Sequence, residues 1–181
     1  MRTSDAPFAA GGHRVCVSFP GKPQKQGCRN RFCAVGNVYS NTLKVLEVTG
    51  KILRDALEQC ATYFQPDAQK RVRIAPHFLE PKEAHYNYDY FAGISYAFDL
   101  ARPAGSRVVE LKRNGREIAP DEKLSLCMCD YRATGAGDFD FYRSCKILRE
   151  IQTDVSELIL NYLRAHPLVE IPAKRAFQVF L

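Results

Sequence analysis

The sequence predicts an α+β fold, with a mixed or antiparallel sheet, hairpins and two main packed helices. Three observations predict it. Apolar and polar residues alternate in several short segments, as they do in half-buried strands. Two longer segments, far apart in the chain, instead have apolar residues at helical spacing. The strand-like segments follow one another through turn residues, which does not suit a doubly wound parallel sheet.

The first half of the chain is expected to contain one strand and one helix. Residues 1–34 have no sustained period, include three of the seven cysteines, and are predicted to form an irregular basic arm. The segment NTLKVLEVTG is a strand pattern closed by Thr49 and Gly50. The segment KILRDALEQCATYF predicts an amphipathic helix. Its buried face consists of Ile52, Leu53, Ala56, Leu57, Cys60 and Phe64. Residues 65–85, with three prolines, are interpreted as a long connection.

The next segments predict a series of hairpin strands. GISYAFDL alternates cleanly, and its apolar positions are Ile94, Tyr96, Phe98 and Leu100. A second strand is expected at 108–112 and a third at 116–119, joined by the tight turn that Asn114 and Gly115 favour. After a Pro-Asp turn, LSLCMC alternates again.

The C-terminal part is predicted as a strand followed by a helix. CKILREI is a short apolar strand, and DVSELILNYLRAH is the strongest helix pattern in the chain. Asp154 and Glu157 have the spacing of a capping box, and Pro167 ends the helix. The stripe expected to be buried consists of Val155, Leu158, Ile159, Tyr162 and Leu163.

Composition and charge exclude several classes of function. Residues 1–34 contribute +5 of the net charge of +6, so the other 147 residues are nearly neutral and offer no basic stripe for nucleic acid. No apolar stretch is long enough to cross a bilayer or to act as an export signal, so the chain as written is expected to stay in the cytoplasm. The odd number of irregularly spaced cysteines indicates free thiols.

Familiar catalytic and metal motifs are missing from the sequence. The segment YRATGAGDFDFY contains glycines, but it lacks the lysine and the following helix of a phosphate-binding loop. Asp138 and Asp140 are too few for a calcium loop. The cysteines form no paired zinc knuckles, the four histidines belong to no known metal pattern, and no serine-hydrolase motif occurs. We therefore predict neither catalytic residues nor metal ligands in this chain.

Aromatic residues remain as candidates for binding. Tyr86, Tyr88 and Tyr90 alternate just before the GISYAFDL strand, and Tyr131 stands at another strand end, before the small-residue loop. Two interpretations stay open. The rings are either core or sheet residues, or two of them face each other across a gap and hold a flat heterocycle.

Three segments carry a family resemblance. The sequences NVYSNTLKVLEVTGKILRDALEQCATYF, YNYDYFAGISYAFDL through DYRATGAGDFDFY, and DVSELILNYLRAH resemble the C-terminal domain of the 5′-nucleotidase family. YNYD and DYRATG are most similar to the bifunctional 2′,3′-cyclic-nucleotide 2′-phosphodiesterase/3′-nucleotidases. The resemblance runs from about residue 35 to 171, in order and with plausible spacing.

The resemblance implies a base clamp of two aromatic residues. One is Tyr86 or Tyr88, depending on which branch of the family sets the spacing, and the other is Tyr131. For the ribose or the loop, the resemblance implies Asn87, Gly135, Gly137 and Asp138. In this sequence the acidic residue of the loop, Asp138, stands one position later than the ribose-binding aspartate of the 5′-nucleotidases.

The resemblance also implies that binding and catalysis belong to different domains. We expect residues 35–181 to be the nucleotide-binding C-terminal domain of a phosphohydrolase of nucleotide catabolism, and residues 1–34 to be foreign or frame-shifted sequence. The two divalent metals would belong to a separate catalytic domain, with no cofactor in this chain, which alone is expected to be inactive. The expected partners are a nucleotide or nucleoside and a metallophosphoesterase domain on another chain, with no nucleic-acid polymer and no membrane.

Family enzymes act in the periplasm, in the cell wall or outside the cell. The alternative is a non-enzymatic remnant or interaction module whose aromatic residues are merely packed.

Overall fold

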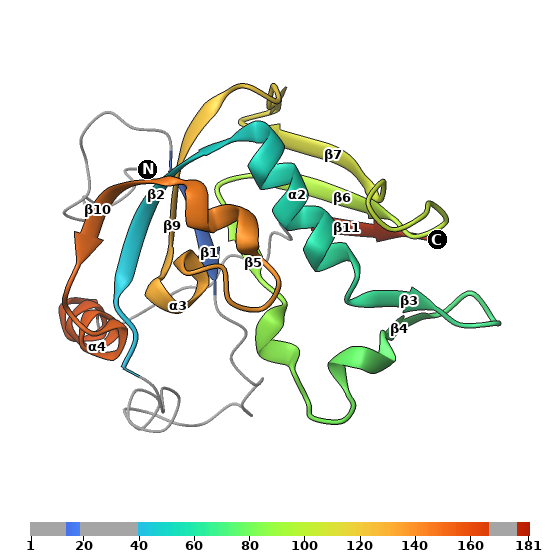
Figure 1. Ribbon diagram of the computed structural model, residues 1–181, viewed down its shortest axis with the longest axis horizontal. Coiled ribbons are helices and arrows are strands. Elements are labelled where there is room, and N and C mark those ends of the chain that lie inside the picture. Colours follow the sequence, from blue (N-terminus) through green and yellow to red (C-terminus); the bar gives the residue numbers. More distant parts are fainter. Residues whose placement is uncertain (1–13, 19–39, 167–176) are drawn as a thin grey trace.

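The structure is a computed structural model that describes residues 14–18, 40–166 and 177–181. In these residues the strands form a five-stranded sheet, a four-stranded sheet and a separate two-stranded hairpin (Figure 1). The five-stranded sheet has the order β10 (Lys146–Ile151), β2 (Leu43–Thr49), β9 (Lys123–Cys129), β1 (Arg14–Ser18) and β5 (Tyr90–Ala92). The four-stranded sheet has the order β11 (Phe177–Phe180), β6 (Ser95–Asp99), β7 (Val108–Arg113) and β8 (Arg116–Glu117). The α+β prediction is confirmed, with β1–β9 and β11–β6 as parallel pairs.

The first helix, α2 (Gly50–Ala61), begins directly at the end of β2. Thr49 ends the strand and caps the helix, because its hydroxyl accepts a hydrogen bond from the Ile52 N–H at 3.3 Å. Most of the apolar face that the sequence predicts is buried, with Leu53 and Leu57 fully inaccessible to solvent. Ile52 is only partly buried, and the prediction was wrong for Phe64, because the helix ends at Ala61 and Phe64 begins β3. The turn of Asn114 and Gly115 is confirmed by the positive φ angles of both residues, 50° and 79°.

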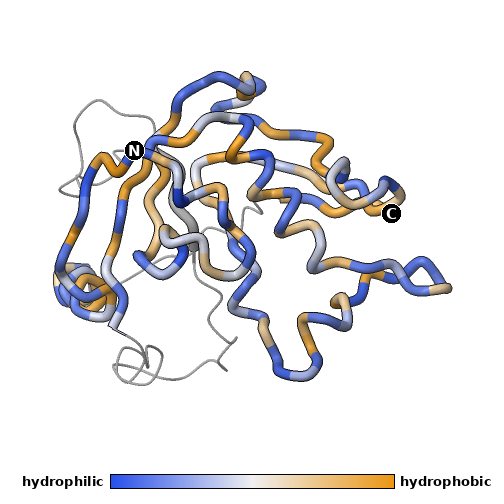
Figure 2. The backbone as a smooth tube through the Cα atoms, in the orientation of Figure 1, coloured by the Kyte–Doolittle hydropathy of each residue, from blue (hydrophilic) through white to orange (hydrophobic). Residues whose placement is uncertain are grey.

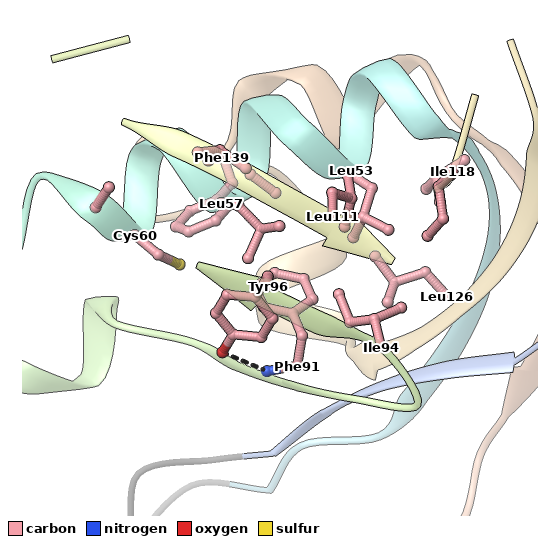
Figure 3. Packing of buried hydrophobic residues seen from close by; sticks show 14 of the residues in the cluster. Leu53, Leu57, Cys60, Phe91, Ile94, Tyr96, Leu111, Ile118, Leu126 and Phe139 are labelled. Carbon is pink, nitrogen blue, oxygen red and sulfur yellow. Dashed lines mark hydrogen bonds between the residues drawn. The ribbon is translucent and has the colours of Figure 1, made fainter. Parts of the chain in front are cut away.

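The core lies between α2 and the two sheets. Figure 3 shows Leu53 and Leu57 of α2 facing Tyr96 of β6 and Leu111 of β7. Leu126 of β9 lies in the same cluster, so one apolar core joins both sheets to the helix. In Figure 2, hydrophobic residues recur along β2, β9 and β6. The turn of the two-stranded hairpin of residues 64–74, on the right of the figure, is mostly hydrophilic.

The C-terminal helix, α4 (Val155–Ala165), forms as predicted, and Asp154 caps it by accepting from the Ser156 N–H at 2.8 Å. The predicted buried stripe is wrong for most of its members. Val155 is buried, but Ile159, Tyr162 and Leu163 are 45%, 48% and 36% exposed. The described part of the chain therefore leaves most of this apolar face uncovered.

Regular structure also forms where the sequence predicts none. Within the predicted arm, Arg14–Ser18 form β1 in the interior of the large sheet, so the expectation of no regular structure was wrong there. The other residues of the arm lie outside the described residues, and its boundary at residue 34 stays a prediction. The 65–85 connection contains most of the hairpin of β3 (Phe64–Pro66) and β4 (Val72–Ile74), followed by the 3₁₀ turns η1 (Pro76–Phe78) and η2 (His85–Asn87).

Candidate functional site

Two chain segments meet at one end of the five-stranded sheet. Strand β1 lies between β9 and β5, parallel to β9 and antiparallel to β5. Its register pairs Cys16 with Cys127 on one side and Ser18 with Tyr90 on the other. The residues that follow β9 and those that precede β5 are therefore at the same end of the sheet. The first group is the short helix α3 (Asp130–Ala133) with its loop, and the second is η2.

The helix α3 fixes the direction of two neighbouring side chains. Cys129, the last residue of β9, caps α3 by accepting from the Arg132 N–H at 3.4 Å. The Asp130 N–H donates to the Thr42 carbonyl at 2.9 Å, which joins α3 to the residue before β2. Tyr131 is 47% exposed, whereas Arg132 is only 3% exposed. One turn of helix thus presents a ring to solvent and sends the next side chain inward.

The structure separates the two tyrosines between which the sequence could not choose. Tyr86 is 50% exposed, and Tyr88 is 2% exposed. The Tyr88 ring packs against the rings of Tyr63, Phe64 and Tyr90, at centroid distances of 4.8, 5.4 and 4.8 Å. Tyr88 is therefore a core residue with no face available to a ligand, and its candidacy for stacking is corrected.

Arg132 joins the two segments. Its Nε lies 2.7 Å from Asp89 Oδ2 as an ion pair, and one Nη donates a hydrogen bond to Asp89 Oδ1 at 3.1 Å. The same Nη donates to the Tyr86 carbonyl at 3.1 Å, and the other Nη donates to the Ala136 carbonyl. The guanidinium carbon also lies 4.2 Å from the centre of the Phe139 ring. The Arg132 side chain thus holds the backbone of Tyr86 through a hydrogen bond, and Tyr131 is the residue that directly precedes Arg132 in the chain.

The loop after α3 depends on residues with positive φ. Gly135, Gly137 and Asp138 have φ angles of 83°, 72° and 68°. Phe139 ends this stretch fully buried within the apolar core, where Figure 3 labels it, and it anchors the loop there. Asp138 is exposed, in a conformation that L-residues adopt rarely.

Asn87 and Gly137 come together although forty-nine residues separate them in the sequence. A Cβ atom on Gly137 would lie 2.4 Å from Asn87 Oδ1 and 2.5 Å from an Nη of Arg132. Asn87 Oδ1 is itself buried and accepts no hydrogen bond within the described residues. Of the residues that the sequence analysis selected for the ribose or the loop, these two are in direct proximity.

Burial dominates the electrostatics beneath the exposed rings. It raises the pKa of Asp89 above its ordinary value, and the opposing effect of the neighbouring Arg132 charge is smaller. Burial also raises the pKa values of Tyr88 and Cys60, so both stay protonated at neutral pH. The ion pair of Arg132 and Asp89 is the charged centre of the region.

The described residues do not contain the side chains of a metal centre. Nowhere in them do three or more His, Cys, Asp or Glu residues cluster in a way that could hold an ion. The resemblance assigns the two metals to a separate catalytic domain, and that assignment stays a prediction. Cys60, Cys129 and Cys145 are free thiols, as predicted. Among the described helices, none is both long and apolar enough to span a membrane.

Arg132 and Asp89 were not predicted as site residues from the sequence. Asp89 is the last residue of YNYD and Arg132 is the third residue of DYRATG, and each is next to an aromatic residue that the prediction used. A signal was available, because a charged residue within an otherwise apolar and aromatic segment is either exposed or paired. The sequence did not reveal that the two were paired with each other.

Comparisons with known proteins agree with this architecture. Residues 35–144 match the family model described as the 5′-nucleotidase C-terminal domain. A trifunctional nucleotide phosphoesterase from Bacillus subtilis is 27% identical over 89% of this chain and 12% of its own length. A 2′,3′-cyclic-nucleotide 2′-phosphodiesterase/3′-nucleotidase from Haemophilus influenzae is 30% identical over 74% of this chain and 22% of its own length.

Solved structures give the same result. A Staphylococcus aureus protein described as a 5′-nucleotidase, solved with α-ketoglutarate, superposes with a TM-score of 0.83 at 31% identity, over 92% of this chain and 33% of that one. The NAD nucleotidase of Haemophilus influenzae, at 14% identity and a TM-score of 0.66 over 94% of this chain and 30% of that one, shares the fold. This chain spans less than a quarter of the curated relatives described above, at 12% and 22% of their lengths.

Proposed function

The chain belongs to the 5′-nucleotidase C-terminal domain family, and on that premise we propose that it is the nucleoside-recognition part of a nucleotide phosphoesterase. The proposed ligands are nucleosides and nucleotides with phosphate on the 2′ or 3′ oxygen. The names of the relatives from the cyclic-phosphodiesterase branch support this ligand class.

One observation carries the proposal. Two tyrosines from distant parts of the sequence, Tyr86 and Tyr131, are half exposed, at 50% and 47%, on segments joined through Arg132. Neither ring packs against another aromatic ring of the described residues, unlike Tyr88. An unpacked tyrosine that stands on a rigid support offers a π-face for a base at little cost in conformational entropy.

The remaining site residues supply polar groups and space. Asn87 has a side-chain amide beside Gly137, and the exposed carboxylate of Asp138 is available to accept from a ribose hydroxyl. In this proposal Asn87 and Asp138 orient the sugar while the two rings hold the base. Positioning of this kind lowers the barrier to a reaction that another domain catalyses.

Catalysis itself is assigned to another part of the phosphoesterase. The relatives are several times longer than this chain, and the described residues have no metal-binding cluster, so the hydrolytic step is assigned to the part of the relatives that this chain does not cover. The proposed partner is a metallophosphoesterase domain, in which two metal ions would activate the attacking water.

Calorimetric titration of the purified chain with adenosine and 3′-AMP tests the proposal. Tyr131→Ala and Tyr86→Ala are each expected to weaken binding by about 1–3 kcal/mol, the contribution of one stacked ring. Tyr162→Ala is the matched control, because Tyr162 is equally exposed, at 48%, but lies on α4. If no nucleoside in a broad panel binds the wild-type chain, the alternative of an interaction module with packed aromatic residues is favoured instead.

A further inference from the structure

Arg132 is a buried charged residue directly beside an exposed aromatic one. It follows the exposed Tyr131, and its own side chain is buried beneath the surface that Tyr131 occupies. Its guanidinium makes bonds to three separate places: the Asp89 carboxylate, the Tyr86 carbonyl and the Ala136 carbonyl. Two of these places lie on the η2–β5 side, and the third lies in the loop that follows α3.

The surroundings hold the guanidinium in one orientation. The Phe139 ring lies 4.2 Å from it on one side. Gly137 approaches so closely that a Cβ there would lie 2.5 Å from an Nη. Asp89 is also fixed, because it is buried at 3% exposure directly before β5 and its carbonyl accepts from the Cys60 thiol at 3.5 Å. The fork therefore has little freedom to rotate.

We infer that Arg132 is a positioning residue, whose guanidinium sets the placement of Tyr86 relative to Tyr131 and so the geometry of the nucleoside site. The inference rests on the proposed function. Asp89 neutralises the buried charge and aligns the fork, while the Tyr86 carbonyl fixes the backbone that carries the first ring. The ring of Tyr131 is fixed because Arg132 is the next residue of the same helical turn.

A lysine is unable to replace this geometry. A guanidinium is planar and donates five N–H groups in fixed directions, whereas an ammonium group is a point charge on a flexible stem. At position 132, lysine would keep the charge opposite Asp89 but would not hold the Tyr86 and Ala136 carbonyls at the same time. Arg132→Lys thus separates charge from geometry.

The experiment compares Arg132→Lys with Arg107→Lys in the full chain. Arg107 is a matched control, because one of its Nη groups bridges the Ala61 and Phe64 carbonyls, at 2.9 and 3.0 Å, between α2 and β3. Both variants are expected to melt at a lower temperature. At a temperature where both are folded, Arg132→Lys is expected to bind adenosine about tenfold more weakly, as for the partial loss of one stacking contact. Arg107→Lys is expected to bind it like the wild type.

A second variant covers the case in which Arg132→Lys does not fold. Arg132→Met combined with Asp89→Leu replaces the buried ion pair by apolar side chains, a change that proteins often tolerate. It removes the bonds to the Tyr86 and Ala136 carbonyls, so loss of adenosine binding by the folded double variant is expected.

The possible results separate the two proposals. Wild-type binding that survives in folded Arg132→Lys, or in the double variant, overturns the positioning role and leaves the proposed function intact. A wild-type chain that binds neither adenosine nor 3′-AMP overturns the proposed function, and the positioning role with it. NMR of tyrosine-labelled protein adds an independent reading: the ring signals of Tyr86 and Tyr131 should shift in Arg132→Lys and stay unchanged in Arg107→Lys.

Discussion

At Gly137 the absence of a side chain allows two distant segments of the chain to pack closely together. Its φ of 72° lies in the left-handed region, and its α-carbon faces Asn87 and Arg132 at distances that leave no room for a methyl group. Gly115 has a similar φ of 79°, but nothing lies within 4 Å of the place where its Cβ would be. The two glycines therefore share the backbone requirement, and only Gly137 adds a steric one.

Replacement of each glycine by alanine separates these two contributions. Gly115→Ala is expected to lower the free energy of unfolding by about 1–2 kcal/mol, the cost of left-handed backbone for an L-residue, and to leave nucleoside affinity unchanged. Gly137→Ala is expected to cost more and to weaken adenosine binding, because Asn87 or Arg132 has to move. Urea unfolding and calorimetric titration of both variants measure this. Equal costs and equal affinities would show that the steric contact has no role.

The buried carboxyl of Asp89 predicts a pH dependence of stability. Since burial raises its pKa in the folded protein, its contribution is fully present below the unfolded pKa of about 3.9 and is lost as the pH rises through the raised folded value. The difference in unfolding free energy between wild type and Asp89→Asn should therefore shrink as the pH is raised from about 4. Urea unfolding at a series of pH values measures it.

Asp67 provides a control of opposite sign. Hydrogen bonds from the Arg71 N–H and from the side chains of Arg73 and Arg71 lower its pKa, so its contribution is present above the unfolded pKa and is lost as the pH falls. The wild-type advantage over Asp67→Asn should thus shrink in acid. If Asp89→Asn showed the same sign as Asp67→Asn, the charge of Arg132 would outweigh burial.

At the scale of elements, the two long helices have similar sequence patterns and different surroundings. In α2, Leu53 is fully buried between the sheets, whereas in α4, Leu163 is 36% exposed. Leu53→Ala is expected to destabilise the chain by about 2–5 kcal/mol, the usual cost of a cavity in a core. Leu163→Ala is expected to stay within about 0.5 kcal/mol of wild type. Thermal and urea unfolding compare the two, and similar losses would mean that α4 is packed in solution.

This contrast also explains how far the sequence predicted the fold. Strands such as β2, β6 and β9 and the helix α2 were predictable, because alternation and helical spacing record which face is buried. The stripe of α4 has the same period, but a period does not say whether another element covers it. The β3–β4 hairpin was missed because its turn depends on the Asp67 carboxylate, which accepts from the N–H groups of Gln69 and Arg71.

The candidate site was predictable to a similar extent. The exposed rings and the glycine loop could be located from the residues and the family resemblance. The choice of Tyr86 over Tyr88 could not be made, because two tyrosines at alternate positions differ only in what packs against them. The pairing of Arg132 with Asp89 was likewise out of reach, since forty-two residues separate the two in the sequence and β1 provides the register that brings their segments to one end of the sheet.

At the scale of the whole molecule, recognition is expected without catalysis. The chain spans 12% and 22% of its two curated relatives described above, and its described residues bring no cluster of metal ligands together. We therefore expect the purified chain to bind adenosine or 3′-AMP in calorimetry but to release no phosphate from 3′-AMP or 2′,3′-cyclic AMP with added manganese. The intact Haemophilus influenzae 2′,3′-cyclic-nucleotide 2′-phosphodiesterase/3′-nucleotidase, run in the same assay, is the positive control.

Metal analysis and phosphate release by the Tyr131→Ala variant test the expectation of binding without catalysis. Metal analysis of the purified chain should find no stoichiometric zinc or manganese, because the described residues bring no cluster of metal ligands together. A hydrolytic site of this class needs bound metal to activate water. Phosphate release that rises with manganese and disappears in Tyr131→Ala would contradict the expectation, since it would require a catalytic centre connected to this nucleoside site. Release that is unaffected by Tyr131→Ala would indicate a contaminating phosphatase, because the proposed base contact would then have no effect on turnover. Binding without release, weakened by about 1–3 kcal/mol on loss of either exposed ring, is the result that a separate recognition domain predicts.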